Sequence, residues 1–302
     1  MPLALISHPL FRSGPMPAIH PDQPRRIEAI DDRLIASGLD MVTQAVDAPC
    51  IDETTLHRVH DPAYVAELRA RTPETGWTRL DADTWLGPDS LTAALHAAGG
   101  AAAGVDLVLA GQATAAFVLG RPPGHHAGRA HAGGFCLINH IAVAAARARK
   151  HGLARIALVD FDAHAGDGTE ALVAEEPTLR MYSLYQEHGF AAPAGPAAGN
   201  IRRLAMPPGG DGAVLREGVE AHWLADLAAF APQIVLVSAG FDGHREDDMA
   251  DLGWVEGDYA WLVSQLKAAT GAPMVLSLEG GYAPAALGRS VHAVLNSLLD
   301  AG

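Results

Sequence analysis

The spacing of hydrophobic and polar residues predicts alternating strands and helices over the last two thirds of the chain. Short apolar runs, typical of buried parallel strands, occupy residues 115–119, 156–159, 178–184, 234–238 and 274–277. Apolar residues recur at helical spacing between these runs, in residues 91–109, 141–150, 218–230 and 259–269. Because strands joined by helices form right-handed crossovers, the pattern predicts a mostly parallel sheet with helices on both faces.

The first ninety residues are less regular. Their pattern predicts an initial strand, a helix that ends near Gly38, and two short helices, in residues 1–8, 27–35, 52–60 and 61–68. Arg25 and Arg26 are expected to be solvated charges where the first helix begins. Two long loops are also expected. One is an acidic loop at 77–90 that could rim a cation site or be simply solvated, and the other is an Ala-, Gly- and Pro-rich loop at 185–213.

The length of the chain indicates a single domain over residues 1–302, because no Pro/Ser-rich linker or low-complexity segment divides it. Hydrophobic residues make up 49% of the chain, and no apolar run is expected to approach the ~20 residues of a membrane span. The first residues lack the basic region of a signal peptide, so a cytoplasmic location is expected. The formal net charge of −14 disfavours nucleic acid as a partner and favours cationic ligands.

The two cysteines, Cys50 and Cys136, are far apart and outside any C-x-x-C spacing. They therefore indicate neither a disulfide framework nor a cysteine zinc site. Both are expected to be buried thiols.

Acidic and imidazole side chains follow the predicted strands at the end where parallel sheets bind ligands. Asp160, Asp162 and His164 follow the run 156–159, and an extended continuation would point all three to one side. Taken alone, this short pattern is equally consistent with a capped turn and a loop histidine.

Three further strand ends strengthen the functional interpretation. His125 and His126 follow a Pro-Pro-Gly turn after 115–119, and adjacent histidines on such a loop are poorly explained by packing. Asp242 follows 234–238 and Tyr282 follows 274–277. Four strand ends together predict one site.

In this order the motifs resemble the histone deacetylase and acetylpolyamine amidohydrolase family, particularly the class II-like bacterial histone deacetylase-like amidohydrolases. The similar segments begin at His20, Arg121, Gly134, Asp160, Ser238 and Leu278, and read HPD, RPPGHH, GFC, DFDAH, SAGFD and LEGGY. The resemblance implies a three-layer α/β fold of the arginase/deacetylase type, with a mostly parallel central sheet and helices on both faces. It also implies hydrolysis of acetyl or related acyl groups from amines such as acetyl-lysine or acetylpolyamines.

The resemblance assigns two ions. One divalent ion, zinc or Fe(II), would be held by Asp162, His164 and Asp242, which matches the three protein ligands of a catalytic zinc site. A structural potassium ion would be held by Asp160, the Ser183 hydroxyl, and the backbone carbonyls of Asp162, His164 and Leu184.

It also assigns the catalytic groups. His126 would act as general base and then general acid, beside His125. Asp160 would orient His125, and Asp167 would orient His126. Tyr282 would donate a hydrogen bond to the developing oxyanion.

The substrate wall is where the resemblance is weakest. Family members pair the phenylalanine equivalent to Phe135 with a second aromatic residue, but the segment 186–195 offers only Phe190 or His188. A wall opened on that side is therefore expected, unless one of these two fills it. Substrate contacts are expected from Gly134, Phe135, Phe190 and Gly280.

The sequence differs from the usual family motifs at two positions, and two other functions remain possible. Ala165 and His140 replace residues usual in the family, but neither is a ligand, so activity is expected to survive. The chain could instead be an arginase-like ureohydrolase, which needs a dimanganese cluster with more carboxylates, or a non-catalytic protein that binds acyl-amines. The expected partner is a small-molecule or peptide acyl-amine, with a homo-oligomeric state left open.

Overall fold

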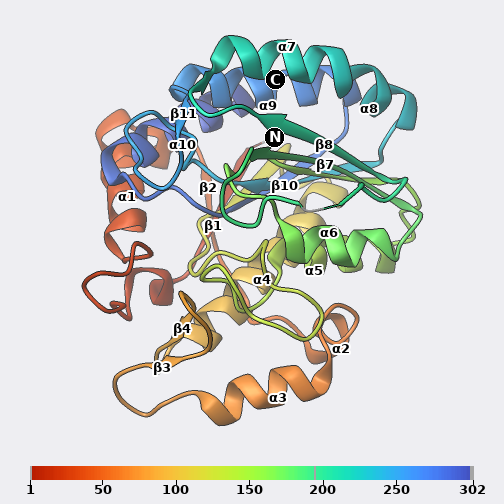
Figure 1. Ribbon diagram of the computed structural model, residues 1–302. Helices are drawn as coiled ribbons and strands as arrows, with labels where there is room; N and C mark the ends of the chain where they lie inside the picture. The colour runs from red at the N-terminus through yellow and green to blue at the C-terminus, as the bar shows by residue number, and fades with distance from the viewer. Residues whose placement is uncertain (1, 194, 300–302) are drawn as a thin grey trace.

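The computed structural model describes residues 2–193 and 195–299 and centres on a parallel sheet of eight strands (Figure 1). In sheet order the strands are β2 (Gln44–Asp47), β1 (Leu3–Ser7), β5 (Ala115–Val118), β12 (Met274–Leu278), β10 (Ile234–Ala239), β6 (Ile156–Asp160), β7 (Leu179–Gln186) and β8 (Ile201–Met206). Two small two-stranded sheets pair β3 (Thr78–Arg79) with β4 (Trp85–Leu86), and β9 (Gly210–Asp211) with β11 (Leu252–Gly253).

Helices cover the sheet on two sides, which makes three layers (Figure 1). The layer drawn above the strands contains α7 (Gly212–His222), α8 (Leu224–Phe230), α9 (Glu256–Thr270) and α10 (Pro284–Leu299), with α1 (Arg25–Ser37) packed on α10. The layer below contains α4 (Ser90–Leu109), α5 (His140–Lys150) and α6 (Asp167–Ala174), with the short α2 (Glu53–Leu56) and α3 (Pro62–Arg71) outside it. The predicted fold class is confirmed.

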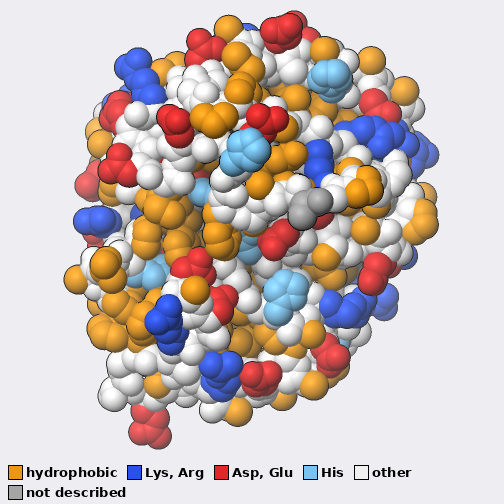
Figure 2. Space-filling model, viewed as in Figure 1, with side chains coloured by type: hydrophobic (Ala, Val, Ile, Leu, Met, Phe, Trp, Pro, Cys, Tyr) orange, Lys and Arg blue, Asp and Glu red, His pale blue; other side chains and the backbone are white. Residues whose placement is uncertain are grey.

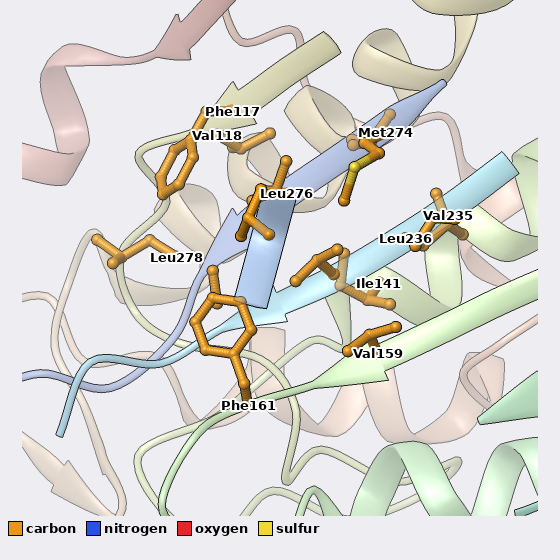
Figure 3. Close-up of a cluster of buried hydrophobic side chains, with 14 of the residues drawn as sticks. Phe117, Val118, Ile141, Val159, Phe161, Val235, Leu236, Met274, Leu276 and Leu278 are labelled. Atoms are coloured by element: carbon orange, nitrogen blue, oxygen red, sulfur yellow. The ribbon is translucent and has the colours of Figure 1, made fainter. Parts of the chain in front are cut away.

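The central strands are buried on both faces, which explains their largely apolar sequences. Every residue of β6, β10 and β12 is buried. Figure 3 shows Phe117 of β5, Leu276 of β12, Leu236 of β10 and Val159 of β6 in one cluster, which Ile141 of α5 also reaches. Burial of each such side chain stabilises the fold by roughly 1.5–3 kcal/mol.

Asn139 joins this framework to the loop that carries the histidine pair. Its side-chain oxygen accepts from the amide of Ala142 at 3.0 Å and so caps α5. Its side-chain amide donates to the carbonyl of Ala127 at 3.0 Å and to the Thr169 hydroxyl at 2.9 Å. The cap therefore fixes the start of α5, the loop after His126 and the start of α6 together.

Several elements differ from their predictions. The expected loop 77–90 contains the short strands β3 and β4. The expected loop 185–213 contains β8 and β9, and β8 was missed because an edge strand bearing Arg202 and Arg203 lacks an apolar run. The edge strand β2 was missed for the same reason, since its residues alternate between half-buried and exposed. The single helix expected at 218–230 is two helices, α7 and α8, separated at Trp223.

Burial differs from expectation at three further places. Within the described residues, α4 is long and apolar enough to cross a membrane, contrary to expectation, but most of it is buried inside the protein as a core helix. Cys136 is buried as expected, whereas Cys50 is exposed because it lies in the surface connection between β2 and α2. Arg26 is fully buried and not solvated, since it points from α1 toward the end of β12.

Candidate active site

The carboxyl ends of four strands meet at one cavity. Strands β5, β12, β10 and β6 are consecutive in the sheet, so loops that are far apart in sequence leave it side by side. The cavity has a volume of about 170 Å³ and is lined by Asp83, His125, His126, Gly134, Phe135, Asp162, His164, Phe190, Met249 and Tyr282. Acidic and histidine side chains also lie among hydrophobic ones near the middle of the face in Figure 2, in keeping with the net charge of −14.

Asp162, His164 and Asp242 converge at the floor of this cavity. One potential ligand atom from each lies within 4.8 Å of the other two. The Nδ1 atom of His164 is 3.0 Å from Oδ1 of Asp162 and 3.0 Å from Oδ2 of Asp242. The strand β6 ends at Asp160, so the two ligands after it lie on a bend.

The surrounding backbone fits closely around the two carboxylates. Oδ2 of Asp162 accepts from the amide of Gly280 at 2.9 Å, and Oδ1 of Asp242 accepts from the amide of Ala163 at 2.9 Å. A Cβ atom at Gly280 would lie 2.2 Å from Oδ2 of Asp242, so only glycine fits there. Gly280, expected to contact substrate, is not among the residues that line the cavity, and its amide binds Asp162.

The electrostatics of the three side chains favour a cation between them. Burial and the neighbouring Asp162 carboxylate raise the pKa of Asp242 to about 6. Burial alone would lower the pKa of His164, but the Asp242 carboxylate raises it to about 11. The two buried carboxylates favour a positive charge beside them, and a divalent ion would supply that charge. Two carboxylates and one imidazole are also a set of ligands that suits zinc.

The two histidines stand side by side, and each contacts its own carboxylate. The rings of His125 and His126 have centroids 4.0 Å apart. Nδ1 of His125 is 3.0 Å from Oδ2 of Asp160, and Nδ1 of His126 is 2.7 Å from Oδ1 of Asp167. Since a carboxylate only accepts, each Nδ1 carries the proton and each Nε2 is directed away from its carboxylate.

The environments of the two histidines differ strongly. Burial opposes charge on His125, but the Asp160 carboxylate raises the pKa of His125 to about 10. Burial and the neighbouring His125 lower the pKa of His126 to about 4. His126 is therefore neutral near pH 7, with an unprotonated Nε2 able to accept a proton, beside a positively charged neighbour.

Glu279, which the sequence analysis did not single out, fixes the loop that carries the histidines. Its fully buried carboxylate accepts from the amides of Gly124 at 2.6 Å and His125 at 3.1 Å, and from the Ser238 hydroxyl at 3.0 Å. Burial raises the pKa of Glu279 to about 7.

Tyr282 is held by Arg26, a residue of α1 that is distant from it in the sequence. The Arg26 guanidinium lies 4.7 Å from the centre of the Tyr282 ring and donates to the carbonyls of Gly281, at 2.6 Å, and Glu279. Asp22 balances the charge of Arg26 through an ion pair of 2.8 Å. Burial raises the pKa of Tyr282 well above its usual value, so the phenol keeps its proton and remains a donor.

Two phenylalanine side chains line the cavity together with Tyr282. Phe135 packs against His20 and Tyr282, with ring centroids 4.5 and 5.7 Å away. Phe190 lines the same cavity, 5.5 Å from the His126 ring, although about half of it is exposed to solvent. His188 is not part of this lining. Of the two alternatives for the wall beside Phe135, the structure favours the one in which Phe190 fills it, because the loop after β7 brings Phe190 to the cavity.

The remaining predicted positions lie behind the cavity or at its edge. Ser183, on β7, is buried, and its hydroxyl has no hydrogen-bond partner among the described residues. His140 is buried behind Gly124, and Ala165 is buried as well; neither lines the cavity. Of the aspartates in the loop 77–90, Asp83 lines the cavity.

Comparison with known proteins gives consistent matches over nearly the whole chain. The histone deacetylase domain matches residues 20–298. A histone deacetylase-like amidohydrolase of Pseudomonas aeruginosa is 34% identical over 90% of this chain and 74% of its own length. Human polyamine deacetylase HDAC10 is 35% identical over 92% of this chain, but over only 44% of its own length. The solved HDA15 HD domain superimposes with a TM-score of 0.92 at 27% identity, covering 99% of this chain and 90% of that one.

Proposed function

Because this chain belongs to the histone deacetylase family, as its motifs already indicated, we propose that it is a zinc-dependent amidohydrolase that removes acetyl or related acyl groups from primary amines. Acetyl-lysine and acetylpolyamines are the proposed substrate classes. The observation that carries the proposal is the meeting, in one cavity, of a three-ligand cluster, a neutral histidine and a tyrosine hydroxyl.

Asp162, His164 and Asp242 would hold the divalent ion. When bound, it would acidify a water molecule and polarise the carbonyl of the substrate amide. The donor set supports zinc, and its two carboxylates leave Fe(II) as the other candidate. The convergence of one partly buried imidazole with two buried carboxylates supports this assignment, since burial without a cation leaves Asp242 with a raised pKa.

The histidine pair would move the protons. His126 is neutral, so its Nε2 would accept a proton from the attacking water and later deliver it to the leaving amine. The Asp167 carboxylate holds the His126 ring by Nδ1 and would stabilise the imidazolium that forms. The positive charge on His125 keeps the pKa of His126 low and so favours the release of the proton to the amine.

Tyr282 would stabilise the tetrahedral oxyanion by donating its hydroxyl proton in a hydrogen bond. Its high pKa supports a role as donor rather than base. Phe135 and Phe190 would flank the acyl-amine chain, and Gly134 would allow the substrate to approach the wall, because all three line the cavity.

A potassium ion below the site would be held by Asp160, Ser183 and the backbone carbonyls of Asp162, His164 and Leu184. The unpartnered, buried Ser183 hydroxyl supports this assignment, because burying a hydroxyl without a partner is costly. The ion would stabilise the segment that carries two of the proposed zinc ligands.

The two alternatives have less support. A dimanganese ureohydrolase would need further carboxylates beside Asp162 and Asp242. In residues 2–193 and 195–299 the other potential ligand group is His125, Cys136 and Glu279, where burial raises the pKa of the Cys136 thiol well above its usual value. A non-catalytic binding protein would have no use for a tyrosine hydroxyl and a neutral histidine aimed at the same cavity.

Metal analysis combined with a substrate panel tests the proposal. The purified protein is expected to contain one transition-metal ion per chain and to hydrolyse a fluorogenic acetyl-lysine peptide, an acetylpolyamine, or both. A chain that binds these amides without turnover, in the presence of added zinc, would support the non-catalytic alternative. Two tightly bound transition metals per chain would support the ureohydrolase.

Phe190 is expected to set the acyl-chain preference. Its ring narrows the cavity beside His126, so the native protein should prefer acetyl-lysine to butyryl-lysine in kcat/KM. Phe190→Ala should change the ratio of acetyl to butyryl turnover by roughly tenfold in favour of butyryl, the scale of one or two methylene groups in an apolar pocket. His188→Ala is the matched control and should leave the ratio unchanged. An unchanged ratio of acetyl to butyryl turnover in Phe190→Ala would exclude Phe190 as the residue that sets the acyl-chain preference.

A further inference from the structure

Asp247 is a buried carboxylate for which the proposed chemistry has no use. It lies in the connection between β10 and β11 and is 6% exposed, and no Lys or Arg forms a salt bridge with it among the described residues. Its two oxygens are occupied by backbone amides. Oδ1 accepts from Met249 at 3.1 Å, and Oδ2 accepts from Tyr282 at 2.5 Å and Ala283 at 2.9 Å.

The segment before Tyr282 needs such an anchor. Gly280 and Gly281 precede it, and Gly281 has a φ of 115°, a conformation open to glycine but strained for other residues. Two glycines leave the tyrosine free to move relative to the sheet unless its peptide groups are fixed. Arg26 binds the carbonyl of Gly281. Asp247 binds the amides of Tyr282 and Ala283, on the other side of that point.

The same carboxylate also contacts a second segment that lines the cavity. Met249 lines the cavity, and its amide donates to Asp247. The carbonyl of Met249 is 3.2 Å from Nε2 of His164, whose Nδ1 faces Asp162 and Asp242. Asp247 therefore contacts the backbone of two segments that line the cavity, at Tyr282 and at Met249.

We infer that Asp247 is a positioning residue that sets the location of the Tyr282 hydroxyl by binding the backbone amides of Tyr282 and Ala283, after the two glycines. Through the amide of Met249 it also connects this segment to a second part of the cavity lining. The inference rests on the proposed function for its catalytic consequence. The backbone clamp itself stands on contacts that do not depend on the reaction.

Asp247→Asn tests the inference. The asparagine side chain has one acceptor oxygen, so it cannot accept both from the amide of Met249 and from the amides of Tyr282 and Ala283. We expect kcat to fall by roughly 100-fold, the scale of a misplaced catalytic group, while KM and the bound metal per chain change little. Asp248→Asn is the matched control: it is the adjacent aspartate, is exposed, and should retain native kcat. Asp247→Glu is a second variant that keeps the charge and both acceptors but shifts them, and it should lower kcat less.

A double-mutant cycle separates positioning from general destabilisation. If Asp247 acts through the Tyr282 hydroxyl, Asp247→Asn should cost little further kcat in a Tyr282→Phe background. The same 100-fold loss in both backgrounds, or native kcat in Asp247→Asn, would overturn the inference. Loss of the metal in Asp247→Asn would also overturn it, since the residue would then act on the ligands.

Amide hydrogen exchange tests the clamp without any substrate. Exchange at Tyr282 and Ala283 should accelerate in Asp247→Asn and Asp247→Glu but not in Asp248→Asn. Unchanged exchange in both Asp247 variants would overturn the clamp. Accelerated exchange in a protein that hydrolyses none of the acyl-amines would instead contradict the proposed function and leave the clamp in place.

Discussion

Asp242→Ala is expected to remove the bound metal and to reduce deacylation by about 1,000-fold or more. The proposed site has three ligands on two strand ends, and loss of one leaves Asp162 and His164 as an incomplete pair. The ion is proposed to activate the water and polarise the amide, contributions worth several kcal/mol, and each 1.36 kcal/mol corresponds to a factor of ten. Metal content and turnover should therefore fall together.

Elemental analysis beside the activity assay decides this outcome. Asp251→Ala is a suitable control, because that aspartate is exposed and on the same connection between β10 and β11. It should retain both metal and activity. Undiminished metal in Asp242→Ala would contradict the assigned ligand set, and lost activity with retained metal would move Asp242 to another role.

Tyr282→Phe is expected to lower kcat by roughly 100-fold while the metal stays bound. The substitution removes one hydroxyl and keeps the ring between Arg26 and Phe135, so the cavity should retain its shape. A hydrogen bond that forms fully only with the oxyanion stabilises the transition state more than the bound substrate. Loss of one such donor costs about 100- to 1,000-fold in kcat.

Steady-state kinetics with metal analysis test the role of Tyr282. KM should change much less than kcat, and metal content should match the native protein. Tyr185→Phe removes the same atom from a half-buried tyrosine at the end of β7 and should be neutral. Native kcat in Tyr282→Phe would exclude the hydroxyl from the mechanism.

The fold could be predicted where burial on both faces of a strand requires a run of apolar residues. The strands β6, β10 and β12 are covered on both faces and are apolar except for Asp160, Ser238 and Ser277 near their carboxyl ends, so their positions could be predicted within a residue or two. The edge strands β2 and β8 have one free side, and their mixed residues are also consistent with a loop. The inward turn of Phe190 depends on the path of the loop after β7, which no local pattern specifies.

Some residues of the candidate site could be located from the sequence and others could not. The proposed ligands and the histidine pair could be located from the sequence because each follows a recognisable strand. Arg26, Asp247 and Glu279 could not, since they act on backbone amides and carbonyls of distant segments. A contact between a side chain and a main-chain atom leaves no complementary residue type to recognise. Arg26 was accordingly expected to be solvated.

The order of strands in the sheet has a consequence for how the protein reaches its native state. Strands β5 and β6 are formed by residues 115–160, yet β10 and β12 lie between them and come from residues 234–278. Until these late strands insert, the apolar edges of β5 and β6 are unpaired, which is a state prone to aggregation. Pairings between segments so distant in sequence also form slowly. The proposed site, which takes residues that follow β5, β6, β10 and β12, is thus complete only when the final third of the chain has closed the middle of the sheet.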